Sequence, residues 1–246
     1  MTRERSIGEF NQDVAEHAGY VYTISQKRSC RSANQRMSAA ILELAELEGA
    51  RVIDIGCGDG TYSAELLAAG ASKVLGVDAA QLAIERARER FGEHKDLHFE
   101  VVDIYSLEPA DEPYDVAVVR GILHHLYDVE RAVERICRVA RRIIVLEPNG
   151  YNPVLKVIEK LSPYHVQHEE KSYRPSQLDR WFERCGGRVE RSTYVGLVPM
   201  FCPDFLVTIC KLVEPLIERT PLLRRICCGQ YAQRIELPSN AGSDCP

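Results

Sequence analysis

Residues 52–63 read VIDIGCGDGTYS, and this stretch decides the fold of the 246-residue chain. An apolar, β-branched run ends near Asp54. Three alternating glycines, Gly56, Gly58 and Gly60, then precede a helical pattern. Glycines at such places allow a sharp backbone turn and the close approach of a ligand, and the first turn of the following helix offers unpaired N–H groups. The stretch predicts a strand, a ligand-binding loop and a helix, in that order.

The spacing of these glycines separates the candidate ligand classes. A dinucleotide-binding loop has the pattern G-x-G-x-x-G, which from Gly56 would place its third glycine at position 61, where Thr61 stands. No Gly-Lys-Ser/Thr sequence follows, so a P-loop is excluded. The pattern is D-x-G-x-G-x-G, beginning at Asp54.

Outward from this stretch, short apolar runs alternate with amphipathic segments. The runs have the length of strands and cover residues 51–55, 73–77, 98–102, 115–119 and 142–146. Helical patterns cover residues 37–47, 61–69 and 80–91, and two more follow the candidate cap residues Asp128 and Ser176. Two final strands are predicted at 188–195 and 230–237. This order predicts an α/β fold: a doubly wound, mostly parallel seven-stranded sheet with an antiparallel edge strand and helices on both faces.

The alternation of apolar runs and amphipathic segments changes along the chain, and these changes predict five parts. They are an N-terminal lid or helical segment (1–48), the ligand-binding α/β core (49–196), an apolar helical insertion that serves as a substrate cap or interface (197–229), the final strand (230–238) and a tail (239–246).

The composition is typical of a globular enzyme and disfavours several other classes. Hydrophobic residues make up 45% of the chain and charged residues 27%. The net charge of −5 argues against a nucleic-acid partner held by phosphate contacts. The nine cysteines form no C-x-x-C pair, which favours buried free thiols over disulfides. Neither a signal peptide nor a run of about 18 apolar residues is found, so we expect a cytoplasmic protein, monomeric or homodimeric, with no transmembrane segment.

An acidic residue, Asp78, ends the second predicted strand, 24 residues after Asp54. A carboxylate at this place accepts hydrogen bonds from both hydroxyls of a ribose. The alternative interpretation is a cap for the helix at 80–91. The glycine loop upstream favours the ribose interpretation.

Together these motifs resemble class I S-adenosylmethionine-dependent methyltransferases, in particular the bacterial small-molecule branch called methyltransferase type 11. The resemblance covers roughly residues 50–195. It implies that S-adenosylmethionine is the cofactor, that Asp103 meets the adenine amino group and that Ile104 packs on the adenine ring. The alternative role of Asp103 is a simple strand-end turn. The remaining cofactor residues that the resemblance implies are Asp54, Gly56, Cys57, Gly58, Gly60, Asp78, Ala79, Arg120 and Gly121.

The stretch DVAVVRGILHHL at 115–126 resembles the family's fourth strand and the loop after it. His124 and His125 lie in this loop, and an imidazole is suited to general-base chemistry on a hydroxyl or amine acceptor. The alternative is a structural role, which we expect more for His125 than for His124. The loop lacks the Asn/Asp-Pro-Pro-Tyr/Phe element of related enzymes, which disfavours methylation of DNA adenine or protein glutamine.

The stretch EPNGYNP at 147–153 and the residues after it resemble the part of the family that faces the acceptor. Glu147 and His165 are further candidate catalytic residues. Asn149, Tyr164 and His168 are candidate substrate-binding residues. His165 and His168 are three residues apart, a spacing that suggests a metal site. No third ligand is evident, so we expect no bound metal.

The resemblance implies that the segment before residue 37 folds over the cofactor and acceptor as a lid. Tyr20 and Tyr22 share one face of an extended chain, where Tyr20 is a candidate for the acceptor and Tyr22 for the cofactor. Arg36 or Tyr22 is a candidate partner of the methionine carboxylate. Packing of both tyrosines against the sheet is the alternative.

The insertion at 197–228 carries an apolar stripe at helical spacing: Phe205, Leu206, Ile209, Leu212, Val213, Leu216 and Ile217. Pro215 is expected to kink this helix. The stripe is typical of core or a dimer contact, and a greasy acceptor pocket or a peripheral membrane contact are alternatives. The charges on the opposite face are mixed, which weakens the membrane interpretation.

The sequence thus predicts transfer of a methyl group from S-adenosylmethionine to a small-molecule or lipid-like acceptor by in-line displacement. Two alternatives stay open. One is a non-catalytic protein that binds the cofactor, and the other is a nicotinamide-dependent oxidoreductase, which Thr61 disfavours.

Overall fold

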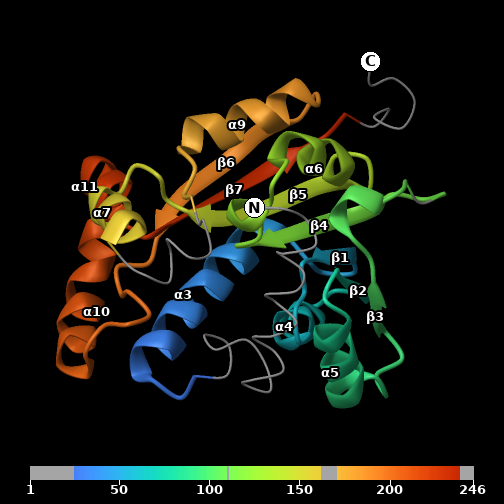
Figure 1. The fold of residues 1–246 in the computed structure, drawn as a ribbon, viewed down its shortest axis with the longest axis horizontal. Coiled ribbons are helices and arrows are strands. Elements are labelled where there is room, and N and C mark those ends of the chain that lie inside the picture. Colours follow the sequence, from blue (N-terminus) through green and yellow to red (C-terminus); the bar gives the residue numbers. More distant parts are fainter. Residues whose placement is uncertain (1–24, 110, 162–170, 239–246) are drawn as a thin grey trace.

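The computed structural model describes residues 25–109, 111–161 and 171–238, and Figure 1 shows their arrangement. A seven-stranded sheet has the order β3-β2-β1-β4-β5-β7-β6. The strands are β1 (Arg51–Ile55), β2 (Lys73–Asp78), β3 (Leu97–Val101), β4 (Tyr114–Arg120), β5 (Ala140–Pro148), β6 (Arg188–Val195) and β7 (Gln230–Glu236). Neighbouring strands pair in parallel except around β7, which is antiparallel to both β5 and β6. The predicted fold class is confirmed, and the antiparallel strand lies one place inside the edge.

Helices cover both faces of the sheet (Figure 1). They are α3 (Arg28–Ala45), α4 (Thr61–Ala68), α5 (Gln81–Phe91), α6 (Val129–Ile136), α7 (Pro153–Leu161), α9 (Pro175–Arg184), α10 (Asp204–Arg219) and α11 (Pro221–Cys227), with short 3-10 turns η1 (Ile104–Ser106) and η2 (Leu123–His125).

Alternation along the strands creates two cores, because successive side chains point to opposite faces of a sheet. In β5, Ile143 and Val145 pack beneath α6 and α9. Their neighbours Ile144 and Leu146 pack on the other face, with residues of α3, α4 and α5. The near-continuous apolarity of the central strands follows from this coverage on both sides.

Several helix boundaries differ from the sequence prediction. Helix α3 begins nine residues earlier than position 37 and ends at Ala45, because Glu46 takes a left-handed conformation with φ of 51°. Asp128 caps α6 as predicted, its carboxylate accepting from the N–H of Arg131 at 3.1 Å. Ser176 is not a cap, because Pro175 already occupies the first turn of α9 and the cap position belongs to Arg174. A proline's fixed φ suits that first turn.

Helix α10 runs through Pro215 without interruption, and the break comes at Thr220, before Pro221 opens α11. Within the described ranges, no helix is both long and apolar enough to span a bilayer. None of the eight cysteines that the structure describes forms a disulfide bond.

The parallel strands position the site. The carboxyl ends of β1, β2, β4 and β5 lie at one edge of the sheet, so the loops that follow them meet there. In open α/β sheets this edge, at the point where the strand order reverses, is where ligands bind. The reversal here lies between β1 and β4.

Candidate functional site

The glycine loop connects β1 to α4 through three left-handed residues. Gly56, Gly58 and Gly60 have φ angles of 77°, 56° and 76°. A Cβ at Gly56 would overlap the Ile122 side chain, and one at Gly60 would lie 2.6 Å from the ring of Phe99. Because an L side chain is strained at such φ values and has no space here, two of the three positions require glycine for both reasons.

Asp78 fastens this loop to the end of β2. Its two carboxylate oxygens accept from the N–H groups of Gly58 (3.0 Å) and Ala80 (2.8 Å). Burial raises the pKa of Asp78, and the backbone hydrogen bonds oppose that rise. Each oxygen can still accept a second hydrogen bond, so the carboxylate is suited to hydroxyl donors. Asp78 is not itself the cap of α5, because Ala80 is the N-cap residue and the Asp78 carboxylate accepts from the N–H of that residue.

Asp54 lies below the loop and faces α4. Its side chain is 3% exposed and accepts from the hydroxyl of Ser63 at 2.6 Å. Burial raises the pKa of Asp54 to about 6, although the Ser63 hydrogen bond and the charge of Arg120 lower it. Asp54 therefore supports the loop from within, and its direct contact with a cofactor stays a prediction.

The tip of β3 is held by a turn that Asp103 closes. The carboxylate accepts from the N–H of Tyr105 at 2.9 Å, and Ile104 is buried. The Tyr105 hydroxyl in turn accepts from the N–H of Asp128, which ties this tip to the start of α6. The strand-end turn is thus present, and the adenine contact predicted for Asp103 and Ile104 stays a prediction.

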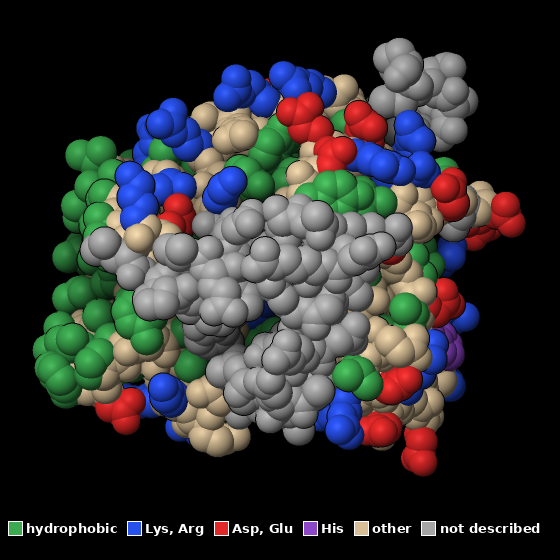
Figure 2. All heavy atoms as spheres, in the orientation of Figure 1, with side chains coloured by type: hydrophobic (Ala, Val, Ile, Leu, Met, Phe, Trp, Pro, Cys, Tyr) green, Lys and Arg blue, Asp and Glu red, His purple; other side chains and the backbone are tan. Residues whose placement is uncertain are grey.

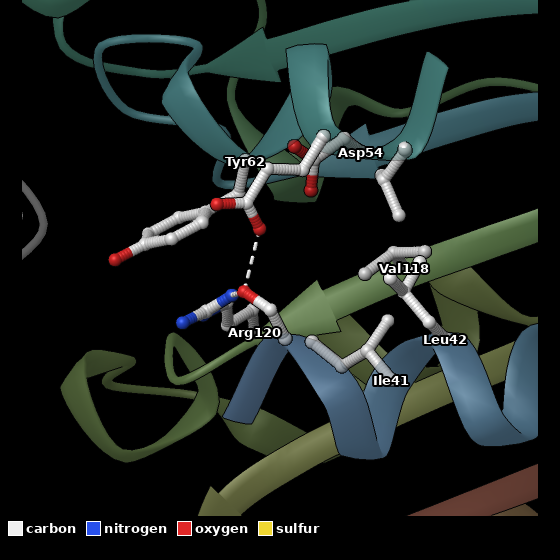
Figure 3. A pocket seen from close by; sticks show the side chains of 9 residues that line it. Ile41, Leu42, Asp54, Tyr62, Val118 and Arg120 are labelled. Carbon is white, nitrogen blue, oxygen red and sulfur yellow. Dashed lines mark hydrogen bonds between the residues drawn. The ribbon is translucent and has the colours of Figure 1, made fainter. Parts of the chain in front are cut away.

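Arg120 ends β4 and lies over the ring of Tyr62, with its guanidinium carbon 3.4 Å from the ring centroid (Figure 3). Its Nη1 donates to the Ser38 hydroxyl at 2.8 Å, and its Nη2 donates to the Asn34 carbonyl at 3.3 Å. Burial lowers the pKa of Arg120, and Tyr62 opposes this effect. A partly buried cation of this kind is suited to an anionic group, and its hydrogen bonds join β4 to α3.

A small pocket lies beside Arg120, between α3, β4 and α4 (Figure 3). It is lined by Ser38, Ile41, Leu42, Asp54, Tyr62, Glu65, Leu66, Val118 and Arg120.

His124 and Glu147 form a hydrogen-bonded pair between the loop after β4 and the end of β5. The His124 Nδ1 lies 2.8 Å from one carboxylate oxygen of Glu147, and the other oxygen accepts from the N–H of Leu123 at 2.8 Å. The carboxylate is fully buried, whereas the His124 side chain is 12% exposed. The ring of His125 lies 3.9 Å from that of His124, centroid to centroid. The structure thus brings three of the four candidate catalytic residues together.

The same loop touches the glycine loop. Ile122 packs against Gly56, and the His124 Cε1 would lie 3.8 Å from a Cβ at Gly121, whose φ is 64°. The imidazole therefore lies near the point where β1 and β4 separate.

Three predicted site residues are engaged elsewhere in this structure. Arg36 forms a two-point ion pair with Glu218 of α10, with N–O distances of 2.9–3.1 Å. The amide of Asn149 donates to the carbonyls of Arg225 and Cys228, both at 2.9 Å, and so holds the end of α11. The Cys57 thiol is buried against Gly76, and burial raises its pKa. Ligand contacts of these three residues stay predictions.

The remaining candidates, Tyr20, Tyr22, Tyr164, His165 and His168, lie outside the described residues. Among the residues that the structure describes, no group of three or more His, Cys, Asp or Glu side chains is arranged to hold a metal ion.

Sequence reasoning missed some residues at the site. Tyr62 and Ser38, which hold Arg120, are separated from it along the chain by 58 and 82 positions, so no local pattern connects them. Tyr173 packs edge-on against Trp181 near this part of the chain, and burial, together with the weaker effect of the Glu147 charge, raises its pKa to about 12. The residue follows the stretch that resembles the acceptor-facing part of the family, which was a signal that could have identified it.

The chain thus has a doubly wound sheet of this order, with acidic side chains at three neighbouring strand tips and a D-x-G-x-G-x-G loop, which is the arrangement expected from the resemblance to class I methyltransferases. Comparison with known proteins agrees. Residues 52–142 match the family model described as a methyltransferase domain. The chain carries a class I S-adenosylmethionine-dependent methyltransferase domain. This match favours the methyltransferase interpretation over a nicotinamide-dependent oxidoreductase.

The curated relatives match this chain over only part of its length. The ubiquinone biosynthesis O-methyltransferase of Alkalilimnicola ehrlichii is 28% identical over 150 residues, which are 56% of this chain and 60% of the relative. The chain spans between 41% and 60% of the length of the three curated relatives first matched.

Two solved structures share the fold. The [4+2]-cyclase SpnF has a TM-score of 0.66 and 19% identity, with 87% of this chain and 85% of that chain covered. The N-methyltransferase NodS of Bradyrhizobium japonicum, solved with S-adenosylhomocysteine, has a TM-score of 0.64 and 12% identity, with coverage of 95% and 99%.

Proposed function

We propose that this protein transfers a methyl group from S-adenosylmethionine to a hydroxyl or amine of a small-molecule or lipid-like acceptor. The observation that carries the proposal is the meeting of two features at one sheet edge. Asp78 and the glycine loop provide a nucleoside site, and the His124–Glu147 pair provides a base beside it.

The residues present fit the cofactor. The Asp78 carboxylate is oriented by two backbone N–H groups and binds the two ribose hydroxyls. Asp103 and Ile104 bind the adenine. The left-handed glycines would leave backbone open to the methionine part, and Arg120, which donates to Ser38 and Asn34 in this structure, would bind its carboxylate. When bound, S-adenosylmethionine supplies a methyl group that the positive sulfur has already activated.

The pair of His124 and Glu147 removes the acceptor's proton. Glu147 accepts from the Nδ1–H of His124, which fixes the tautomer and leaves Nε2 as the nitrogen that takes a proton. The buried carboxylate stabilises the imidazolium that then forms. The other residues of the site contribute by aligning the reacting groups, because an in-line displacement requires the acceptor atom, the methyl carbon and the sulfur to be collinear.

Transfer of a labelled methyl group tests the proposal. We expect wild-type protein with labelled S-adenosylmethionine to label hydroxylated aromatic or lipid acceptors in a panel. Replacing His124 by Gln should lower kcat by about 10²–10⁴-fold and leave cofactor affinity within about two-fold. Glu147→Gln keeps the shape but loses the charge, and it should lower kcat and shift the base's limb of the pH–rate profile.

The outcomes separate this proposal from cofactor binding without methyl transfer. The [4+2]-cyclase SpnF shares this fold, and its name is not that of a methyltransferase. Binding of S-adenosylhomocysteine with no label transferred to any acceptor would favour a non-methylating role. Equal turnover by wild type and His124→Gln would show that His124 is not the general base. If the protein binds neither S-adenosylmethionine nor S-adenosylhomocysteine, the proposal as a whole is wrong.

A further inference from the structure

Helix α10 exposes its apolar side chains and turns two of its acidic side chains toward the protein. With 3.6 residues per turn, Val207, Cys210 and Glu214 share the face that packs on the domain, and Glu218 follows one turn later. The opposite row is Phe205, Ile209, Leu212 and Leu216, which are 71%, 56%, 81% and 68% exposed. The apolar stripe of this helix therefore faces away from the protein.

Two inward carboxylates hold the helix in this orientation. Glu214 is 3% exposed and accepts from the N–H of Leu197 at 3.0 Å and from Lys211. Glu218 accepts from the N–H of Gly196 at 2.9 Å and from the guanidinium of Arg36. These contacts anchor α10 to α3 and to the loop after β6, so the outward apolar row is fixed by specific hydrogen bonds.

The exposed surface extends beyond α10. Leu222, Leu223 and Ile226 of α11 are 68%, 38% and 40% exposed, and Val154 and Val157 of α7 are 62% and 54% exposed. Figure 2 shows hydrophobic side chains gathered along the side of the molecule where α10 and α11 lie in Figure 1. We name it the α10–α11 surface. Contiguous exposed apolar area of this kind marks an interaction site.

The charges that accompany the α10–α11 surface are mainly positive. Arg219 follows the outer row of α10, and Arg224 and Arg225 lie on α11. The acidic residues of α10 after its first turn are the two that point inward, and exposed Asp204 in that first turn lies beside Arg28. The sequence places acidic and basic residues together in this segment, which disfavours a membrane contact. In the structure the two glutamates point inward, whereas the arginines accompany the exposed apolar row.

We propose that the α10–α11 surface docks on an anionic lipid bilayer. An outward apolar row flanked by arginines is the arrangement of helices that lie in a membrane interface. A second copy of this chain fits the surface less well than a bilayer. In a symmetric dimer the arginines of the two copies would face one another, and Glu214 and Glu218 point inward and could not pair with them. The inference stands apart from the proposed methyl transfer.

Flotation of the full chain with vesicles tests this proposal. We expect binding to vesicles that contain phosphatidylglycerol, weaker binding at high salt, and little binding to pure phosphatidylcholine. Leu212→Glu combined with Leu216→Glu should weaken binding at least about ten-fold, and Arg219→Gln about five-fold. Leu82→Glu is the matched control, since Leu82 is 37% exposed on α5, and it should bind like wild type.

Other outcomes would overturn the proposal. One is no flotation with anionic vesicles at low salt, and another is equal flotation of wild type and the double variant. A third is a dimer, measured by sedimentation velocity, that the double variant abolishes while no vesicle binding is seen. Thermal unfolding of each variant checks folding, and the exposed positions are expected to leave the midpoint near that of wild type.

Discussion

At the scale of single residues, buried carboxylates shape the site. Asp54 and Asp78 both carry a raised pKa because burial penalises their charge. Their hydrogen bonds to Ser63, Gly58 and Ala80 hold the glycine loop in place. Each residue therefore has a structural task in addition to any contact with ligand, and variants must separate the two.

Replacing Asp78 by Ala is expected to weaken S-adenosylhomocysteine binding by about 2–4 kcal/mol, because two charge-assisted hydrogen bonds are lost. Calorimetry measures this change. Asp78→Asn is the control for the loop, since its amide oxygen can keep one backbone contact. An unchanged affinity in Asp78→Ala would show that the ribose assignment is wrong.

Asp54 should make the protein's stability depend on pH. Its folded pKa of about 6 lies above the ordinary value of 3.8, so its contribution is present below pH 3.8 and lost as pH rises through about 6. Asp54→Asn removes that loss. From about pH 5 to about pH 7.5, the unfolding free energy of the variant should gain about 1–2 kcal/mol on wild type. Urea unfolding at both pH values measures it, and a constant difference would contradict the raised pKa.

At the scale of elements, α3 connects the site to the α10–α11 surface. One side of the helix offers Asn34 and Ser38 to Arg120, and the other side offers Arg36 to Glu218. Positions 34 and 38 are one turn apart, whereas position 36 lies about 200° around the helix from 34. This geometry directs Arg36 toward α10 and leaves Arg120 as the cation at the carboxyl end of β4.

Arg36→Ala is expected to lower the free energy of unfolding by about 2 kcal/mol, because Glu218 is left half-buried without its cation. Chemical denaturation measures this loss. Glu43→Gln is the matched control, since Glu43 is 58% exposed and its ion pair with Arg36 should contribute less than about 0.5 kcal/mol. Weaker cofactor binding with no loss of stability would return Arg36 to the cofactor role predicted from sequence.

At the scale of the whole molecule, cofactor binding should stabilise the fold, because a ligand that binds only the native state shifts the unfolding equilibrium. S-adenosylhomocysteine at about 100 times its Kd should add about 2.7 kcal/mol and raise Tm by about 5–10 °C. Differential scanning calorimetry with and without ligand measures the shift. NADH at the same concentration is the control, and a larger shift with NADH would contradict the methyltransferase assignment.

The sequence by itself determined the fold class, the positions along the chain of the strands up to β5 and the glycine loop, because these depend on local patterns. Apolar runs of strand length and glycines at fixed spacing act within a few residues of one another. Asp54, Gly56 and Asp78 carry that information in their spacing along the chain.

Only the tertiary structure decided which distant side chains meet. Glu147 joins His124 because β4 and β5 are neighbours in parallel register, and no sequence spacing expresses that contact. The outward direction of Leu212 and Leu216 likewise depends on Glu214 and Glu218 finding partners on other elements. A helical stripe predicts a shared face, but the direction of that face is set by the competition between burying apolar area and satisfying buried charge.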